Sequence, residues 1–140
     1  MPKPPLSTEF VLAIALGAVP GAISRYYIGQ FIKETWGESF GYYGTFLVNI
    51  TGCLLIAYIL TLAAESLRPP SPRLRVLLTT GFCGAYTTFS AYGLETQQLL
   101  EQGNSIALLY GAGSPILGMV AIQGGVWLAR ASKHLIGHDS

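Results

Sequence analysis

Charged side chains are scarce in this sequence. Only 11% of its 140 residues are Asp, Glu, Lys or Arg, whereas a soluble domain carries about 25%. Hydrophobic residues make up 51% of the chain, and the mean hydropathy is +0.46. This composition predicts an all-α integral membrane protein with a single transmembrane domain over residues 1–140. The net charge is only +1, so the chain has no basic surface of the kind that binds nucleic acid.

The sequence also lacks a catalytic constellation. Its apolar stretches hold no paired carboxylates and no histidine, and Glu9 and Glu95 are carboxylates near their ends. There is no glycine-rich phosphate-binding loop. The two cysteines, Cys53 and Cys83, fall in apolar stretches without metal-ligand spacing, and we expect them to be small buried hydrophobes. These absences predict a protein that is not an enzyme and has no catalytic residues.

Long apolar stretches are what the sequence does contain. A helix needs about 20 residues to cross the bilayer core. Four stretches meet this length and predict four transmembrane helices, at residues 10–32, 42–64, 75–100 and 105–128. In the first, Gly17 and Gly21 form a small-xxx-small pair that lets a neighbouring helix approach closely. In the last, Pro115 is expected to kink the helix.

Residues 79–96 make a poor lipid-facing helix. This block contains three glycines and six Ser or Thr residues, which lower helix propensity. Irregular backbone is tolerated at membrane depth only inside protein or beside water. We therefore expect the other spans to surround this block, which favours a permeation or ion-binding element. The alternative is a short loop with tight turns outside the membrane.

Isolated polar residues in the other spans allow two interpretations each. Arg25 either reaches lipid head groups or places a positive charge at an aqueous vestibule. Asn49 either makes an interhelical hydrogen bond or lines a pore as an NH2 donor. Tyr110 and Ser114 share one helix face and either satisfy a helix contact or form a polar track.

Three motifs make the chain resemble the Fluc (CrcB) family of fluoride channels. The most specific runs from Gly81 to Tyr92 and is followed by Leu94-Glu95. The other two are Gly21-Ala22-Ile23-Ser24-Arg25-Tyr26 in the first span and Asn49-Ile50-Thr51-Gly52 in the second. The similarity covers essentially the whole chain, with four spans in the same order.

This resemblance implies a small four-helix subunit that pairs antiparallel with a second copy to form two fluoride pores. The third helix would break at mid-membrane. There the family holds a central structural sodium ion with backbone carbonyls, which map onto Gly84 and Thr87. With two carbonyls from each subunit, the sodium site would have four oxygen ligands. Such a protein would lie in a cell membrane as a multi-pass protein of the bacterial inner-membrane type, in contact with lipid.

The resemblance also implies roles for individual residues. Those that map onto the fluoride pore are Asn49, Phe89, Ser90, Tyr92, Tyr110 and Ser114, and Arg25 maps onto the vestibule. The later hydroxyl positions of the fourth-helix track appear here as Gly118 and Ile122. Two residues depart from the family pattern: Tyr92 stands where phenylalanine is usual, and Ala85 replaces a glycine of the break. Because the family has a plain ring at position 92, Tyr92→Phe is expected to retain conduction.

A fluoride pore must replace the water of a small, strongly hydrated anion with donors. Amide NH2 groups, hydroxyls and the positive edges of aromatic rings can do so. Passive flow suffices for export, because an inside-negative potential drives an anion outward by about 2.3 kcal/mol per 100 mV. The alternative function is a small proton-coupled multidrug-type exporter of four helices. That class needs an embedded glutamate in the first helix, where this chain has Arg25 and, at its start, Glu9.

Basic residues are distributed unevenly between the two predicted sides. With the N-terminus in the cytoplasm, six of the eight would lie inside: Lys3, Arg68, Arg73, Arg75, Arg130 and Lys133. Only Lys33 lies in an outside loop. The positive-inside rule then favours one orientation, whereas an antiparallel homodimer needs both. We expect the homodimer, with an oppositely oriented paralogue as the alternative partner.

Overall fold

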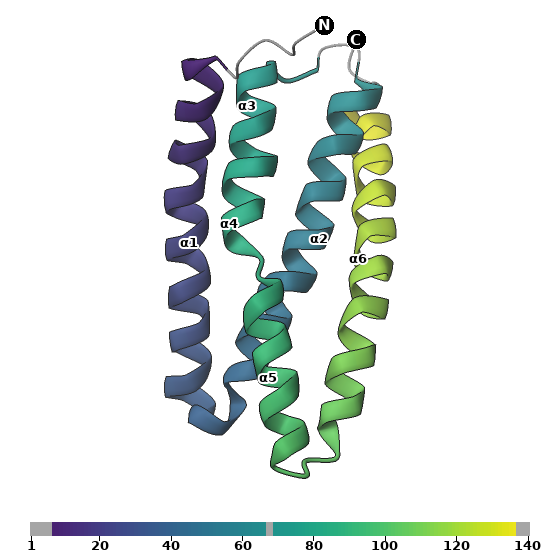
Figure 1. Cartoon of the computed structure of the whole chain (residues 1–140). Helices are drawn as coiled ribbons and strands as arrows, with labels where there is room; N and C mark the ends of the chain where they lie inside the picture. Colours follow the sequence, from purple (N-terminus) through teal and green to yellow (C-terminus); the bar gives the residue numbers. More distant parts are fainter. Residues whose placement is uncertain (1–6, 67–68, 137–140) are drawn as a thin grey trace, which may run out of the picture.

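The computed structural model describes residues 7–66 and 69–136, and the side chains up to Lys133. This part of the chain is helical and contains no strand. The helices run side by side along one common direction, and α1 (Thr8–Trp36) begins at the end of the molecule where α6 (Ile106–Ile136) ends (Figure 1). Three helices are long and apolar enough to cross a membrane, over Thr8–Trp36, Glu38–Glu65 and Ile106–Lys133. The prediction of an all-helical membrane protein is therefore confirmed at this level.

The long helices contain three of the four predicted spans. Helix α1 covers Thr8–Trp36 and leads through the short 3-10 helix η1 (Glu38–Phe40) into α2 (Gly41–Glu65). Helix α6 (Ile106–Ile136) continues through Pro115 and extends well beyond the predicted end at residue 128. Its extension is stabilised by charge, because Arg130 and Lys133 both donate to the Glu65 carboxylate at the end of α2.

The third predicted span is a composite of short helices. It begins with α3 (Pro72–Val76), where the Ser71 hydroxyl accepts a hydrogen bond from the Leu74 N–H and Pro72 occupies the first helical turn. A π-helical segment, η2 (Leu77–Cys83), and the single turn α4 (Gly84–Tyr86) follow. After an interruption, α5 (Phe89–Glu101) completes the segment. Residues 79–96 are thus mostly helical, and the alternative of a loop with tight turns is wrong.

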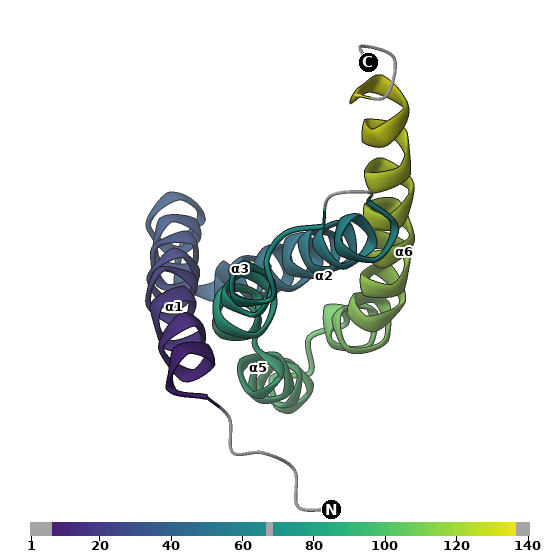
Figure 2. The same ribbon diagram turned by 90° about the horizontal axis from the view of Figure 1, so that it is seen from above.

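The interruption changes the neighbours of this segment. Its first half, up to α4, packs against α1, whereas α5 packs against α6 and α2. Viewed along the helices, α1, α3, α2 and α6 follow one another in an arc, and α5 lies on one side of it (Figure 2). The segment therefore crosses from one edge of the molecule towards the other at the point where the helix is broken.

Glycines allow α1 to contact the backbone of this segment. A Cβ atom on Gly17 would collide with the Leu77 carbonyl, and one on Gly21 would collide with the Phe82 carbonyl. Both glycines are buried. The close approach predicted from their spacing is confirmed, with the π-helical segment as the neighbour.

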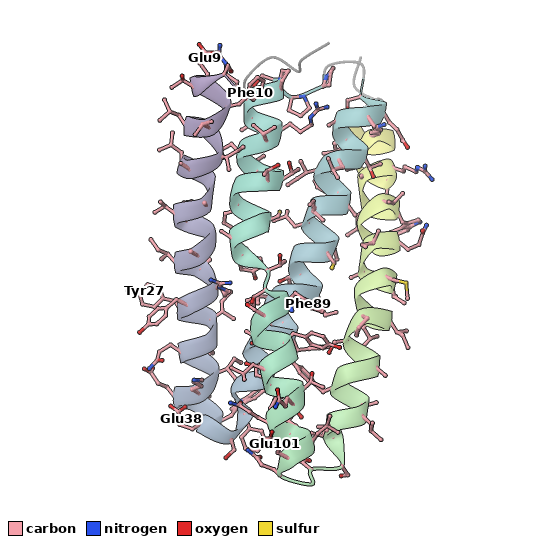
Figure 3. The ribbon with its side chains drawn as sticks, in the orientation of Figure 1. Glu9, Phe10, Tyr27, Glu38, Phe89 and Glu101 are labelled. Carbon is pink, nitrogen blue, oxygen red and sulfur yellow. The ribbon has the colours of Figure 1, made fainter. Side chains whose placement is uncertain are left out.

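Charged residues gather at the two ends of the molecule. Arg73 pairs with Glu9 at the end where α1 begins and α6 ends, and Lys133 and Arg130 pair with Glu65 there. Glu38 and Glu101 lie at the opposite end (Figure 3), where Lys33 pairs with Glu38. Two basic residues counted in the predicted charge bias, Lys3 and Arg68, lie outside the described residues.

Candidate functional site at the helix break

The break consists of two extended residues. Thr87 has φ −85° and ψ 159°, and Thr88 has φ −150° and ψ 123°, so neither can continue a helix. Thr88 also caps the next helix, because its hydroxyl accepts a hydrogen bond from the Ala91 N–H at 3.2 Å. The break therefore presents the carbonyl end of α4 and the N–H end of α5 to the same region.

Asn49 on α2 pairs with the backbone of the break. Its Nδ2 donates to the Thr88 carbonyl at 2.9 Å, and its Oδ1 accepts from the Thr88 N–H at 2.8 Å. One carboxamide thus satisfies both backbone groups of Thr88, as a neighbouring strand would do. Of the two interpretations of Asn49, the interhelical hydrogen bond is present, and a second N–H on Nδ2 remains for another acceptor.

This pairing frees a carbonyl on α4. In a continuous helix the Thr88 N–H would donate to the Gly84 carbonyl, four residues earlier. Because it donates to Asn49 instead, Gly84 lacks that helical partner. The neighbouring Thr87 carbonyl accepts a long hydrogen bond, 3.5 Å, from Nη1 of Arg25. Arg25 therefore points at the break and not at the end of α1.

A groove of about 420 Å³ opens beside the break, between α2 and α6. Its walls are mostly apolar, and six predicted site residues contribute to them: Asn49, Gly84, Thr87, Phe89, Tyr92 and Ser114. Arg25, Ser90 and Tyr110 are predicted site residues that do not line it. The Phe89 side chain, at the start of α5 (Figure 3), is 83% exposed, so its ring packs little within the subunit.

Aromatic rings lead from the groove towards the end that carries Glu38 and Glu101. Phe89 and Tyr92 have ring centroids 5.6 Å apart, and Tyr92 and Tyr110 are 5.5 Å apart. Tyr110 in turn meets Tyr42 edge-on at 5.5 Å, and Tyr42 lies 4.5 Å from Tyr43. The structure thus joins Phe89, Tyr92 and Tyr110, which the sequence placed on two separate spans.

Glu95 also belongs to this site, although the sequence indicated no role for it beyond its place near the end of a span. Its carboxylate accepts hydrogen bonds from the Thr45 hydroxyl at 2.8 Å and from the Tyr110 hydroxyl at 2.7 Å. It therefore connects α2, α5 and α6. Two features of the sequence could have indicated it: Glu95 lies three residues after Tyr92, and Thr45 lies four residues before Asn49.

The remaining hydroxyls of the site are used within the subunit. Ser114 donates to the Tyr110 carbonyl of its own helix at 2.5 Å, and Ser90 shares a hydrogen bond with the Thr88 hydroxyl at 3.2 Å. The Tyr92 hydroxyl donates to the Gly111 carbonyl on α6. The Tyr92 and Ser114 protons already have acceptors, so an anion would have to compete for them.

Known proteins are similar to this chain over most of its length. The family model described as "CrcB-like protein, Camphor Resistance (CrcB)" matches residues 12–126. A protein of Trichormus variabilis named fluoride-specific ion channel FluC is 47% identical over 120 residues, which cover 85% of this chain and 87% of that protein. A protein of the same name from Synechococcus sp. is 42% identical over 132 residues, covering 93% and 98%. A third, from Chloroflexus aurantiacus, is 44% identical over 121 residues, covering 86% and 94%.

Proposed function

This chain belongs to the CrcB-like family, and from that membership and the groove at its helix break we infer that it is a fluoride-selective ion channel. It is not an enzyme, because its relatives are named ion channels. The channel is passive: fluoride flows out of the cytoplasm along its electrochemical gradient. Hydrogen fluoride enters as a neutral weak acid and dissociates inside, so an anion path with no proton coupling is sufficient for export.

The observation that carries this proposal is the helix break at Thr87 and Thr88, where the Thr88 backbone pairs with Asn49. A helix that ends and restarts within a protein presents partial negative charge on its carbonyl end and partial positive charge on its N–H end. Here both ends adjoin one groove, and Asn49 holds the extended backbone between them. Such an arrangement can bind an anion near the start of α5 and a cation near the end of α4.

The fluoride path uses donors that surround this groove. Phe89 and Tyr92 offer ring edges, and Asn49 offers the N–H that Thr88 does not use. Ser90, Tyr110 and Ser114 offer hydroxyls, whose rotation can redirect a proton from its present acceptor towards fluoride. Arg25 supplies the positive charge at the break that favours anions over cations.

The carbonyls of Gly84 and Thr87 are suited to a structural sodium ion. Gly84 lacks its helical partner, and carbonyl oxygens are hard ligands of the type that sodium accepts. With the same two carbonyls from a second copy, four oxygens would meet on a two-fold axis. A bound sodium ion would neutralise the partial negative charge of these carbonyls. In the single subunit, Nη1 of Arg25 lies 3.5 Å from the Thr87 oxygen and neutralises the partial charge of that carbonyl.

We propose that the chain is a single domain with four membrane crossings. Helix α2 ends, and α6 begins, at opposite ends of the molecule (Figure 1). Residues 72–101 therefore extend over the same length as the three long helices, with the break near the middle of that length. This supports a fourth crossing that is broken at mid-membrane. We propose that the membrane is of the bacterial inner-membrane type.

We further propose that two copies pair antiparallel to form two pores. The groove is open on one side, and Phe89 at its rim is largely exposed, which supports a pore completed by a second subunit. The alternative partner is an oppositely oriented paralogue. Arg73, Arg75, Arg130 and Lys133 lie at one end and Lys33 at the other, a bias that favours one orientation.

Efflux from liposomes that contain only this protein tests the proposed function. Vesicles loaded with potassium fluoride release the anion when valinomycin dissipates the potassium potential, and a fluoride electrode follows the release. Chloride-loaded vesicles are the control, and we expect fluoride release without chloride release. Equal release of both anions would contradict selectivity. Drug uptake driven by a pH gradient would instead support the multidrug-type exporter.

A further inference from the structure

Pro115 creates an unusual feature in α6. Proline has no backbone N–H, so it cannot donate to the carbonyl four residues earlier in a helix. For Pro115 that carbonyl belongs to Gly111. The Gly111 oxygen thus faces the bundle without its ordinary helical donor, and an unpaired carbonyl away from water is costly.

The Tyr92 hydroxyl supplies the missing donor. It reaches from α5 and donates to the Gly111 carbonyl. The two helices are close together here, because a Cβ atom on Gly111 would lie only 2.9 Å from Cγ2 of Thr96. The Thr96 hydroxyl in turn donates to the Tyr92 carbonyl at 2.8 Å, so this hydroxyl and this carbonyl are bonded to each other within α5.

We propose that Tyr92 is a positioning residue whose hydroxyl replaces the hydrogen bond that Pro115 removes from α6. A phenol has a single proton, and this proton is held by Gly111. The hydroxyl is therefore not a fluoride ligand, because turning this proton towards the anion would leave the Gly111 carbonyl, which Pro115 cannot serve, without a donor. It fixes the ring between Phe89 and Tyr110, where Tyr92 lines the groove.

The role of the Tyr92 ring rests on the proposed function, whereas the role of its hydroxyl rests on geometry alone. This assignment changes the expectation for Tyr92→Phe that the family resemblance implied. Phenylalanine fits this position without cost only if residue 115 has an N–H that can return to Gly111. In this chain Pro115 makes the hydroxyl necessary, so Tyr92 and Pro115 act as a pair.

A double-mutant cycle tests the pair: Tyr92→Phe, Pro115→Ala and the combination, each compared with the parent. The first readout is reversible unfolding of the purified protein in mixed micelles. Tyr92→Phe should lower the folded-to-unfolded ratio about tenfold in the parent, the effect of one lost hydrogen bond to a buried carbonyl. In the Pro115→Ala protein the same change should alter the ratio less than about twofold, since the helical N–H is restored.

The second readout is the fluoride efflux rate per folded protein. Tyr92→Phe should slow efflux several-fold, and adding Pro115→Ala should bring the rate back to within about twofold of the parent. Tyr86→Phe is the matched control. Its hydroxyl bonds to Thr51 at 2.9 Å, away from Gly111, so its effect should be the same with and without Pro115→Ala.

Several results would overturn the proposal. One is a Tyr92→Phe protein with the stability and efflux of the parent; another is a combined variant as impaired as Tyr92→Phe. If Tyr92→Phe alone does not fold, recovery of folding by Pro115→Ala supports the pair, and failure of the combination to fold contradicts it. If the parent itself releases no fluoride, the proposed function fails, while the unfolding cycle still decides whether the hydroxyl replaces the helical donor.

Discussion

Phe89 is the residue whose exposure makes its role testable. Its ring is 83% exposed in the subunit, so replacing it removes little packing energy from the fold. Phe89→Ile keeps most of the apolar volume but removes the positive ring edge. We expect this change to abolish fluoride efflux and to leave the folded subunit intact, as measured with a fluoride electrode and by size-exclusion chromatography.

Leu94→Ile provides a matched control for that change. Leu94 lies on the same helix and is also largely exposed, but it carries no ring. It should conduct like the parent. A Phe89→Ile protein that conducts normally would mean that Phe89 only packs against lipid or a partner subunit.

Asn49→Asp separates the two hydrogen bonds of the break. Aspartate keeps an acceptor for the Thr88 N–H but has no donor for the Thr88 carbonyl, and places a negative charge beside it. We expect loss of fluoride efflux together with a decrease of about 1–3 kcal/mol in the free energy of unfolding. Efflux is lost because the anion path meets a carboxylate. Stability falls because the Thr88 carbonyl loses its donor.

Asn104→Asp controls for the charge itself. Asn104 lies in the turn before α6, where its side chain only accepts a hydrogen bond from the Ile106 N–H at 3.1 Å. An aspartate there keeps the acceptor, so stability and efflux should not change. Unchanged efflux in Asn49→Asp would remove Asn49 from the conduction path.

Much of the site composition was predictable at the scale of single residues. The resemblance to a known family named Asn49, Phe89, Tyr92 and Ser114 as pore residues, and the structure brings these four to one groove. Their hydrogen-bond partners could not be predicted. The bond from Asn49 to Thr88 joins residues 39 positions apart, so no local pattern encodes it.

At the scale of helices, three of the four predicted spans correspond to long apolar helices, because hydrophobic length decides them. The ends of the helices were harder to predict, because side-chain pairing can extend a helix. Helix α6 continues past residue 128, where Arg130 and Lys133 bind Glu65. The π-helical segment was not predicted either. It depends on the contact with α1 through Gly17 and Gly21, which is tertiary.

That contact yields a prediction at the same scale. Gly17→Ala should reduce the amount of folded protein sharply, because its Cβ atom would collide with the backbone carbonyl of Leu77 and neither helix can move aside freely. Such overpacking costs about 1–3 kcal/mol or more. Thermal unfolding of detergent-solubilised protein, followed by circular dichroism, measures the loss.

Gly124→Ala is the control for helix propensity. A Cβ atom on Gly124 meets nothing within 4 Å, so alanine there should stabilise α6 by up to about 1 kcal/mol. If Gly17→Ala and Gly124→Ala behave alike, the close approach of α1 to the π-helical segment is not important for folding.

At the scale of the whole molecule, orientation in the membrane decides which pore can form. Helix α1 begins and α6 ends at the same end of the molecule (Figure 1), so a reporter fused after α6 also reports the side on which α1 begins. The described basic residues are concentrated at that end, and the positive-inside rule counts Lys and Arg with little contribution from acids. The pairs with Glu9 and Glu65 therefore do not remove the bias.

An antiparallel homodimer requires that this bias be overcome in part of the population. We expect a cytoplasm-active and a periplasm-active reporter, fused separately to the C-terminus, both to give substantial signal. Lys33→Gln is the informative variant, because Lys33 is the basic residue at the opposite end and pairs only with the exposed Glu38 among the described residues. Without it the chain should shift towards the cytoplasmic reporter, and fluoride efflux per molecule should fall as fewer opposite copies remain to pair. A parent that signals only from the cytoplasmic reporter, and releases no fluoride alone, would contradict the homodimer and require an oppositely oriented partner chain.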